Sequence, residues 1–182
     1  MIEVDTSRLR LRRWTEDDLL GLRAMLTDWE VMQLQPDGAI TESAAESLTI
    51  DTYGYTWARR GYGIWAVELK ETGRFIGSLG LQFPGHWPDP EVSWMIDKTC
   101  WRRGLATEGA AAALEFGFVH RGLPRILSFC MPGNDASERV MQKVGMTLTD
   151  ITVCALRGTP TICYEMTREQ FLLRKGESCA SS

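Results

Sequence analysis

Apolar and polar residues follow two different rhythms along the chain, which predicts a mixed α+β protein. Residues 8–12, Arg-Leu-Arg-Leu-Arg, alternate with a period of two, as in a half-buried β-strand. Leu19, Leu22 and Leu26 recur at helical spacing and form an apolar stripe. Thr15 stands before this stripe, where a hydroxyl side chain can cap the first turn of a helix. The first strand is therefore followed by an amphipathic helix.

The remaining pattern extends this order to most of the chain. The clearest hairpin signal is the pair of strand-like runs 62–69 and 74–83, joined by Lys-Glu-Thr-Gly. The other expected elements are a helix from Thr41 or Ser43 to Arg60, a strand over 91–97, a helix over 110–119, a strand over 125–131, a helix over 135–144 that ends at Gly145, and strands over 146–155 and 161–167.

This order predicts the α+β class, with a mixed, mostly antiparallel sheet of six to seven strands and about four helices. We find no repeat or linker, so residues 1–173 are expected to form a single domain. A last helical turn is expected over 168–173. Residues 174–182 are polar and small, and we expect them to be a disordered tail.

Charge and cysteine content narrow the functional classes. The net charge of −4 and the estimated pI of about 5.3 argue against a nucleic-acid binder, which usually carries a basic field. No segment approaches the roughly 18 apolar residues of a membrane span, and the start of the chain lacks the order of a signal peptide. The five cysteines show no zinc-like spacing, so we expect no metal site and a reducing, cytoplasmic location.

The stretch that carries most chemistry is Trp101-Arg-Arg-Gly-Leu-Ala-Thr-Glu108, between a predicted strand and a predicted helix. A helix start presents unpaired N–H groups and the positive end of the helix dipole, so it favours phosphates. Gly104 and Ala106 keep bulky side chains away from the backbone, while Arg102 and Arg103 add charged donors. Neither a Walker loop nor a three-glycine dinucleotide fingerprint is present.

The pattern instead resembles the pyrophosphate loop of the GCN5-related N-acetyltransferase (GNAT) superfamily, Arg/Gln-x-x-Gly-x-Gly/Ala. The resemblance is closest to its RimJ/RimL-like branch and covers residues 6 to about 171. It rests on Thr6–Arg12, Thr15–Asp18, Asp28–Met32, Gly73–Gly77, Glu91–Asp97, Gly104–Glu108, and Asn134–Ser137 continuing to Lys143–Met146. The first loop position is Trp101, where the superfamily has Arg or Gln. Tryptophan at this position is also common in the RimJ/RimL-like branch.

The resemblance implies the GNAT fold, in which the fourth and fifth strands splay apart, and acetyl-CoA as the acetyl donor. The pantetheine arm would lie in the gap between these strands. The cofactor-binding residues carried over from the family are Trp94, Met95 and Ile96 for pantetheine, Arg102, Arg103, Gly104, Leu105, Ala106 and Thr107 for pyrophosphate, and Asn134 for pantetheine. Arg139 and Lys143 could reach the 3′-phosphate or adenine end; the alternative is that they are solvated cations on an exposed helix face.

Amide formation from a thioester needs a neutral amine and a proton for the leaving thiolate. An α-amine with a pKa near 8 is about one-tenth neutral at physiological pH, whereas a lysine amine is only about 0.1% neutral. A group that accepts the amine's proton is therefore needed, and Glu91 is our candidate. The alternative for Glu91 is a strand-edge carboxylate that is solvated or paired with Arg74 or Arg102.

Two further residues are assigned to the catalytic group. Asn134 can cap its helix through the side-chain oxygen, and the family adds a hydrogen bond to pantetheine. Ser137 lies one turn on and could protonate the thiolate or order a water molecule; otherwise it is an early-helix serine. The catalytic set is thus Glu91, Ser137 and Asn134.

The leading hypothesis is an N-acetyltransferase that acts by direct attack of a primary amine on acetyl-CoA in a ternary complex. The acceptor would be a protein N-terminus or a small-molecule amine, and a homodimer is plausible from the resemblance. The alternative is a non-catalytic acyl-CoA-binding sensor or scaffold. An intact set of Glu91, Asn134 and Ser137 argues against that alternative.

Overall fold

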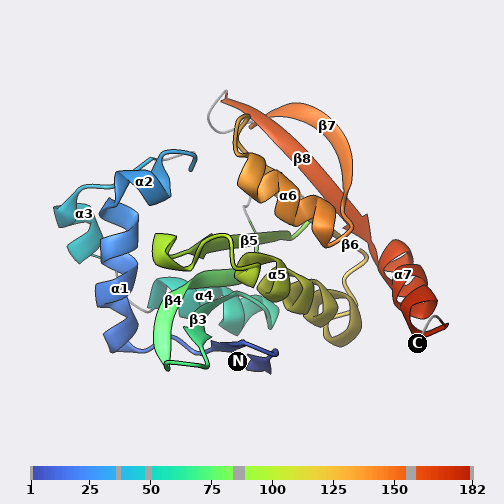
Figure 1. Cartoon of the computed structure of the whole chain (residues 1–182), viewed down its shortest axis with the longest axis horizontal. Coiled ribbons are helices and arrows are strands. Elements are labelled where there is room, and N and C mark those ends of the chain that lie inside the picture. The colour runs from blue at the N-terminus through green and yellow to red at the C-terminus, as the bar shows by residue number, and fades with distance from the viewer. Residues whose placement is uncertain (1, 36–37, 48–50, 84–88, 155–158, 181–182) are drawn as a thin grey trace.

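The computed structural model describes residues 2–35, 38–47, 51–83, 89–154 and 159–180, and its centre is one sheet of eight strands (Figure 1). The strands are β1 (Val4–Asp5), β2 (Leu9–Arg12), β3 (Ile64–Leu69), β4 (Arg74–Gln82), β5 (Glu91–Ile96), β6 (Arg125–Cys130), β7 (Thr147–Cys154) and β8 (Thr159–Thr167). Their order is β1-β2-β3-β4-β5-β6-β8-β7, and only the β5–β6 pair is parallel. The predicted α+β class and mostly antiparallel sheet are confirmed.

Seven α-helices flank the sheet in the described part of the chain. They are α1 (Glu16–Thr27), α2 (Trp29–Met32), α3 (Glu42–Glu46), α4 (Asp51–Arg60), α5 (Leu105–Glu115), α6 (Asp135–Lys143) and α7 (Arg168–Ala180). A 3₁₀ turn, η1 (Lys98–Cys100), precedes α5, and a π-helical turn, η2 (Phe116–His120), follows it.

Strand alternation gives the sheet two apolar faces, each covered by a different helix. In β3, Trp65 and Val67 are fully buried in the cluster that contains α5, while Ala66 is buried with α1 on the opposite face. Trp65 packs edge-on against Phe116, with ring centroids 5.1 Å apart. The central helix α5 is therefore fixed against the sheet along its whole length.

The parallel strands β5 and β6 separate soon after they meet. Among the described residues, their register contains a single pair, Glu91 with Leu127. At the next residue of each strand, the link is made by a side chain: the hydroxyl of Ser128 donates to the Val92 carbonyl at 3.0 Å. The expected splay of the family's fourth and fifth strands thus corresponds to β5 and β6 in this chain. It opens an edge of β5 toward α6 (Figure 1).

Helix starts follow the predicted caps. The Asp18 carboxylate accepts from the Thr15 N–H at 2.8 Å and the Asp18 N–H bonds the Thr15 carbonyl, which fixes the start of α1. Thr41 accepts from the Ala44 N–H at the start of α3, at 3.3 Å. At the end of α6, Gly145 adopts φ 88°, the left-handed conformation expected of a glycine after a helix.

Several elements differ from the expectation. The predicted helix from Thr41 to Arg60 is two helices, α3 and α4, on either side of residues 48–50, which lie outside the described residues. The strand β1 and the four-residue helix α2 were not expected, because segments this short carry no clear period. The final helix extends through Ala180 instead of ending near residue 173, so residues 174–180 are helical where a disordered tail was expected.

None of the helices in the described part of the chain has the length and apolar character needed to cross a membrane. The two C-terminal strands form the longest hairpin of the sheet and extend beyond α6 (Figure 1).

Candidate functional site

A groove of about 440 Å³ lies where β5 and β6 separate. Three parts of the chain that are distant in sequence form its walls: β5 with the loop that leads into α5, the first turns of α6, and α2 with the residues after it. The predicted cofactor residues that line it are Trp94, Met95, Ile96, Arg102, Gly104, Leu105, Ala106, Thr107, Asn134 and Arg139. The structure therefore brings together nearly all of the residues that the sequence singled out for the acetyl donor.

The loop before α5 has the geometry of an anion site. Gly104 stands at the cap position of α5 with φ 77°, and a Cβ added there would meet only the tip of Arg8, at 3.6 Å. The first described hydrogen bond into α5 runs from the Glu108 N–H to the Gly104 carbonyl, so the N–H groups of the three preceding helical residues remain available at the groove.

Arg102 is the one non-glycine residue with positive φ, 59°, in the part of the chain that the structure describes. A side chain in this region is strained by about 1–2 kcal/mol. Glycine would remove that strain, but it would also remove a guanidinium from the groove. Backbone strain of this kind is concentrated at functional loops.

The charged residues of the groove's lining are mostly cationic. Arg102, Arg139 and Lys143 contribute positive charge, the last two one helical turn apart on α6. Glu30 is the carboxylate among the described lining residues, and Lys98 donates to it at 3.0 Å. The balance of charge suits a ligand with several phosphates.

Arg103 differs from the expectation, because its side chain is not part of the groove's lining. Its Nη2 lies 3.4 Å from the Glu71 carboxylate on the β3–β4 turn, and both side chains are exposed. The backbone of Arg103 is also held in place, because its carbonyl accepts a hydrogen bond from Arg8 Nη1 at 2.8 Å.

Asn134 and Ser137 both lie at the groove, as expected for residues at the start of α6. The Asn134 Oδ1 accepts from the Ser137 N–H at 3.1 Å, so the predicted capping role of Asn134 is confirmed. The cap uses the oxygen of the amide and leaves its NH₂ group as a donor.

Glu91 lies at the closed end of the β5–β6 opening, at the one register pair that joins these strands. It is not part of the groove's lining. The expected alternatives, pairing with Arg74 or Arg102, are not what the structure has: Gln82 Nε2 donates to Glu91 Oε2 at 3.0 Å, and the backbone of Phe129 also bonds the carboxylate.

Burial raises the pKa of Glu91 from its ordinary value of 4.5 to about 7, against the opposing effect of its two hydrogen bonds. The residue keeps partial access to solvent. A carboxylate in this pKa range is suited to accept a proton near neutral pH.

The structure adds two parts to the predicted site. The first is the wall that α2 and the residues after it form, with Glu30, Val31 and Leu34, where no helix was predicted. The second part is an interaction behind the loop, in which Arg8 contacts both the Arg103 carbonyl and the Glu108 carboxylate.

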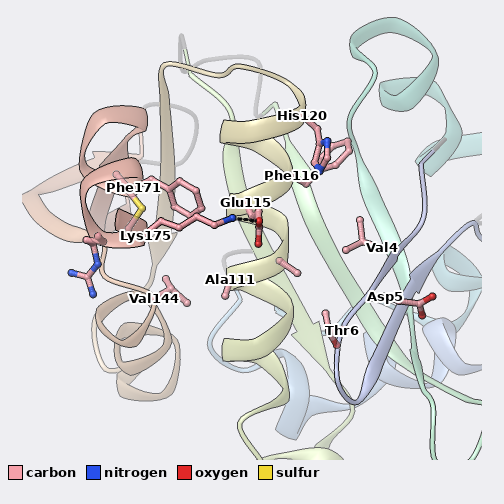
Figure 2. A pocket seen from close by; sticks show the side chains of 13 residues that line it. Val4, Asp5, Thr6, Ala111, Glu115, Phe116, His120, Val144, Phe171 and Lys175 are labelled. Carbon is pink, nitrogen blue, oxygen red and sulfur yellow. Dashed lines mark hydrogen bonds and ion pairs between the residues drawn. The ribbon is translucent and has the colours of Figure 1, made fainter. Parts of the chain in front are cut away.

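A second hollow of about 520 Å³ lies beyond α5, toward β1 and α7 (Figure 2). Its walls include Phe116 and Phe171, and the ion pair between Glu115 and Lys175 crosses it. It contains none of the predicted site residues. No group of three or more potential metal ligands occurs among the described residues.

Residues 8–147 match the family model described as "Acetyltransferase (GNAT) domain". Two proteins of Bacillus subtilis (strain 168) are similar over most of the chain. YkkB is 32% identical over 148 residues, covering 78% of this chain and 83% of its own. YnaD, named an uncharacterised N-acetyltransferase, is 30% identical over 147 residues, covering 80% of this chain and 82% of its own.

Solved structures support the fold. A crystal structure of an acetyltransferase from Agrobacterium tumefaciens str. C58 has a TM-score of 0.80 at 23% identity, covering 91% of this chain and 94% of that one. RimL, an α-N-protein acetyltransferase in complex with coenzyme A, has a TM-score of 0.73 at 14% identity, covering 93% and 99%. A Vibrio cholerae spermidine N-acetyltransferase in complex with CoA and spermine has a TM-score of 0.73 at 16% identity, covering 92% and 99%.

Proposed function

Because the chain belongs to the GNAT acetyltransferase family, we propose that it is an N-acetyltransferase that moves an acetyl group from acetyl-CoA to a primary amine. One observation carries this proposal: the cationic groove in the β5–β6 opening, with the left-handed Gly104 at the start of α5. Gly104 has no side chain of its own to stand between a pyrophosphate and the backbone N–H groups at this helix start.

The acetyl donor supplies an activated thioester, and residues of this chain bind its phosphates and orient its pantetheine arm. The backbone from Gly104 to Thr107 and the Arg102 guanidinium bind the pyrophosphate. Arg139 and Lys143 meet the phosphate at the far end of the donor. The Asn134 NH₂ group orients the pantetheine arm along the free edge of β5.

Proton transfer falls to two residues at different places. Glu91, with a pKa of about 7, accepts the proton of the attacking amine directly or through one water molecule. Ser137 lies at the groove and gives a proton to the departing thiolate or orders the water that does. This division keeps the base and the acid on separate elements, β5 and α6.

An α-amine fits this site better than a polyamine. Its pKa near 8 lies about one unit above that of Glu91, whereas an alkyl ammonium near 10.4 lies more than three units above. A polycation also needs carboxylates, and Glu30, the carboxylate in the described lining, is already bonded to Lys98. We therefore propose a protein or peptide N-terminus, as in the RimJ/RimL-like branch, with residues 1–173 acting as one catalytic domain.

The test is release of free CoA thiol from acetyl-CoA against peptides with varied N-termini, amino acids, polyamines and aminoglycosides. Gly104→Glu adds a side chain and a negative charge at the left-handed residue that begins α5, next to the anion site, and should abolish release. Gly73→Glu is the matched control, because Gly73 has a similar φ, 66°, on an open turn away from the groove.

Release with peptides that is lost in Gly104→Glu and kept in Gly73→Glu would support the proposal. Release with polyamines instead would overturn the α-amine acceptor. Acetyl-CoA binding without release from any amine would favour the sensor or scaffold, and absence of binding would overturn the assignment of the groove.

A further inference from the structure

Arg8 is held in the turn between β1 and β2, far in sequence from the phosphate-binding loop. The Thr6 hydroxyl accepts from the Leu9 N–H at 2.9 Å, and the Arg8 carbonyl accepts from the Lys70 N–H at 2.9 Å. These bonds anchor the turn to β3. They leave the Arg8 side chain directed at the start of α5.

Arg8 makes three contacts with that helix start. Its backbone N–H donates to Glu108 Oε1 at 2.7 Å, and its Nε donates to Glu108 Oε2 at 2.6 Å. Its Nη1 donates to the Arg103 carbonyl at 2.8 Å. Thr6 adds a fourth bond, from its hydroxyl to Glu108 Oε1 at 2.6 Å. We call Thr6, Arg8 and Glu108 the latch.

The latch determines which way one peptide group faces. In a planar trans peptide the C=O and N–H groups point in opposite directions. Because Arg8 holds the Arg103 carbonyl, the Gly104 N–H of the same peptide must point away from Arg8. Gly104 lines the groove and Arg8 does not, so this N–H faces the groove side of the loop.

Without this bond the peptide could rotate. Such a rotation changes the ψ of Arg103 and the φ of Gly104, and Gly104, with φ 77°, is a residue that tolerates the change. Rotation would turn a carbonyl oxygen toward the groove, where its negative partial charge would oppose a phosphate. The guanidinium of Arg8 does not line the groove. Its link to the groove is its hydrogen bond to the Arg103 carbonyl, in the loop before α5.

We propose that Arg8 is a positioning residue for the acetyl donor: through the latch it holds the Arg103–Gly104 peptide in the orientation that binds pyrophosphate. This inference rests on the proposed function. It predicts a defect that is specific to ligands with a pyrophosphate, since the described hydrogen bonds that Thr6, Arg8 and Glu108 make with one another and with the Arg103 carbonyl involve no residue of β5 or α6.

The experiment measures CoA binding by calorimetry in wild type, Arg8→Ala, Arg8→Lys and Arg10→Ala. Arg10 is the matched control, because its side chain is 48% exposed against 45% for Arg8, and it pairs with Asp5 and Glu68 instead of the loop. We expect the Kd for CoA to be roughly five- to tenfold higher in Arg8→Ala, to return part of the way to the wild-type value in Arg8→Lys, and to be unchanged in Arg10→Ala.

A second readout separates positioning from general damage. Turnover with S-acetylpantetheine, which lacks the pyrophosphate, should be unchanged in Arg8→Ala, whereas kcat/KM with acetyl-CoA should fall five- to tenfold. Equal losses with both donors, or no loss with either, would overturn the inference, and Arg8→Lys decides the question if Arg8→Ala does not fold. If wild type itself binds no CoA, the proposed function fails instead.

Discussion

Replacing Glu91 with glutamine should make the protein more stable and less active, and both effects should depend on pH. Glu91 is ionised only above about pH 7, because burial raises its pKa from 4.5. In the unfolded chain the same carboxyl ionises near 4.5. The folded state therefore binds the Glu91 proton more tightly, and the protein loses stability as the pH rises from about 4.5 to about 7.

The size of the effect follows from the difference between the two pKa values. At 1.36 kcal/mol per pKa unit, the difference corresponds to at most about 3.4 kcal/mol above pH 8, and partial solvent access lowers this figure. At pH 5 less than about 1 kcal/mol remains, since Glu91 is protonated in the folded state. Glutamine can still accept the hydrogen bond from Gln82, so Glu91→Gln should gain about 1–3 kcal/mol at pH 8.5 and little at pH 5.

Urea unfolding at the two pH values measures this gain, with the exposed Glu169→Gln as the matched control. Catalysis should change in the opposite sense: wild-type kcat/KM should rise with pH through about 7 and then level off, and Glu91→Gln should lose at least tenfold in turnover with CoA affinity unchanged. A variant that is destabilised at pH 8.5, or one that keeps wild-type turnover, would refute the assignment of Glu91 as the base.

Substitutions at three further positions test the groove. Ser137→Ala should lower kcat about tenfold without changing CoA affinity in a calorimetric titration, and a normal kcat would exclude Ser137 from the chemistry. Asn134→Ala should lose about 1 kcal/mol of stability because the α6 cap is removed, whereas Asn134→Asp should keep the cap but bind acetyl-CoA more weakly, as a carboxylate cannot donate; equal stability of the two variants would contradict this. Arg102→Gly should raise the melting temperature by relieving the positive φ and raise the Kd for CoA, and a lower melting temperature would argue that Arg102 is not strained.

The phosphate-binding end of the groove could be predicted because its chemistry is local. Gly104 and the helix that follows it are adjacent in sequence, and an anion site at a helix start needs only backbone donors and small side chains. The Asn134 cap was predictable for the same reason, since the cap and the N–H it satisfies are three residues apart. Strand and helix order likewise followed from periods that repeat over six or more residues.

The missed parts of the site depend on contacts that no local pattern records. Arg8 and Glu108 are 100 residues apart, and the residues around either one do not indicate that the two side chains meet. The α2 wall consists of four helical residues, too few to show a period of 3.6. Arg103 was misplaced because a side chain next to a phosphate loop can point to either side, and here Glu71 on the β3–β4 turn lies on the other side.

The groups that bond Glu91 support its proposed role as the base. A guanidinium beside Glu91 would favour the ionised form and lower its pKa, so that it would hold no proton at neutral pH and would be a weaker base. Among the described residues, the groups that bond Glu91 are the neutral side chain of Gln82 and the backbone of Phe129. Arg74, which the sequence offered as a partner, instead donates to Thr99. Burial at the closed end of the β5–β6 opening outweighs the hydrogen bonds from Gln82 and Phe129 and brings the pKa of Glu91 to about 7. The cation on the adjoining strand β6, Arg125, pairs with Asp89 and Glu165 instead of Glu91.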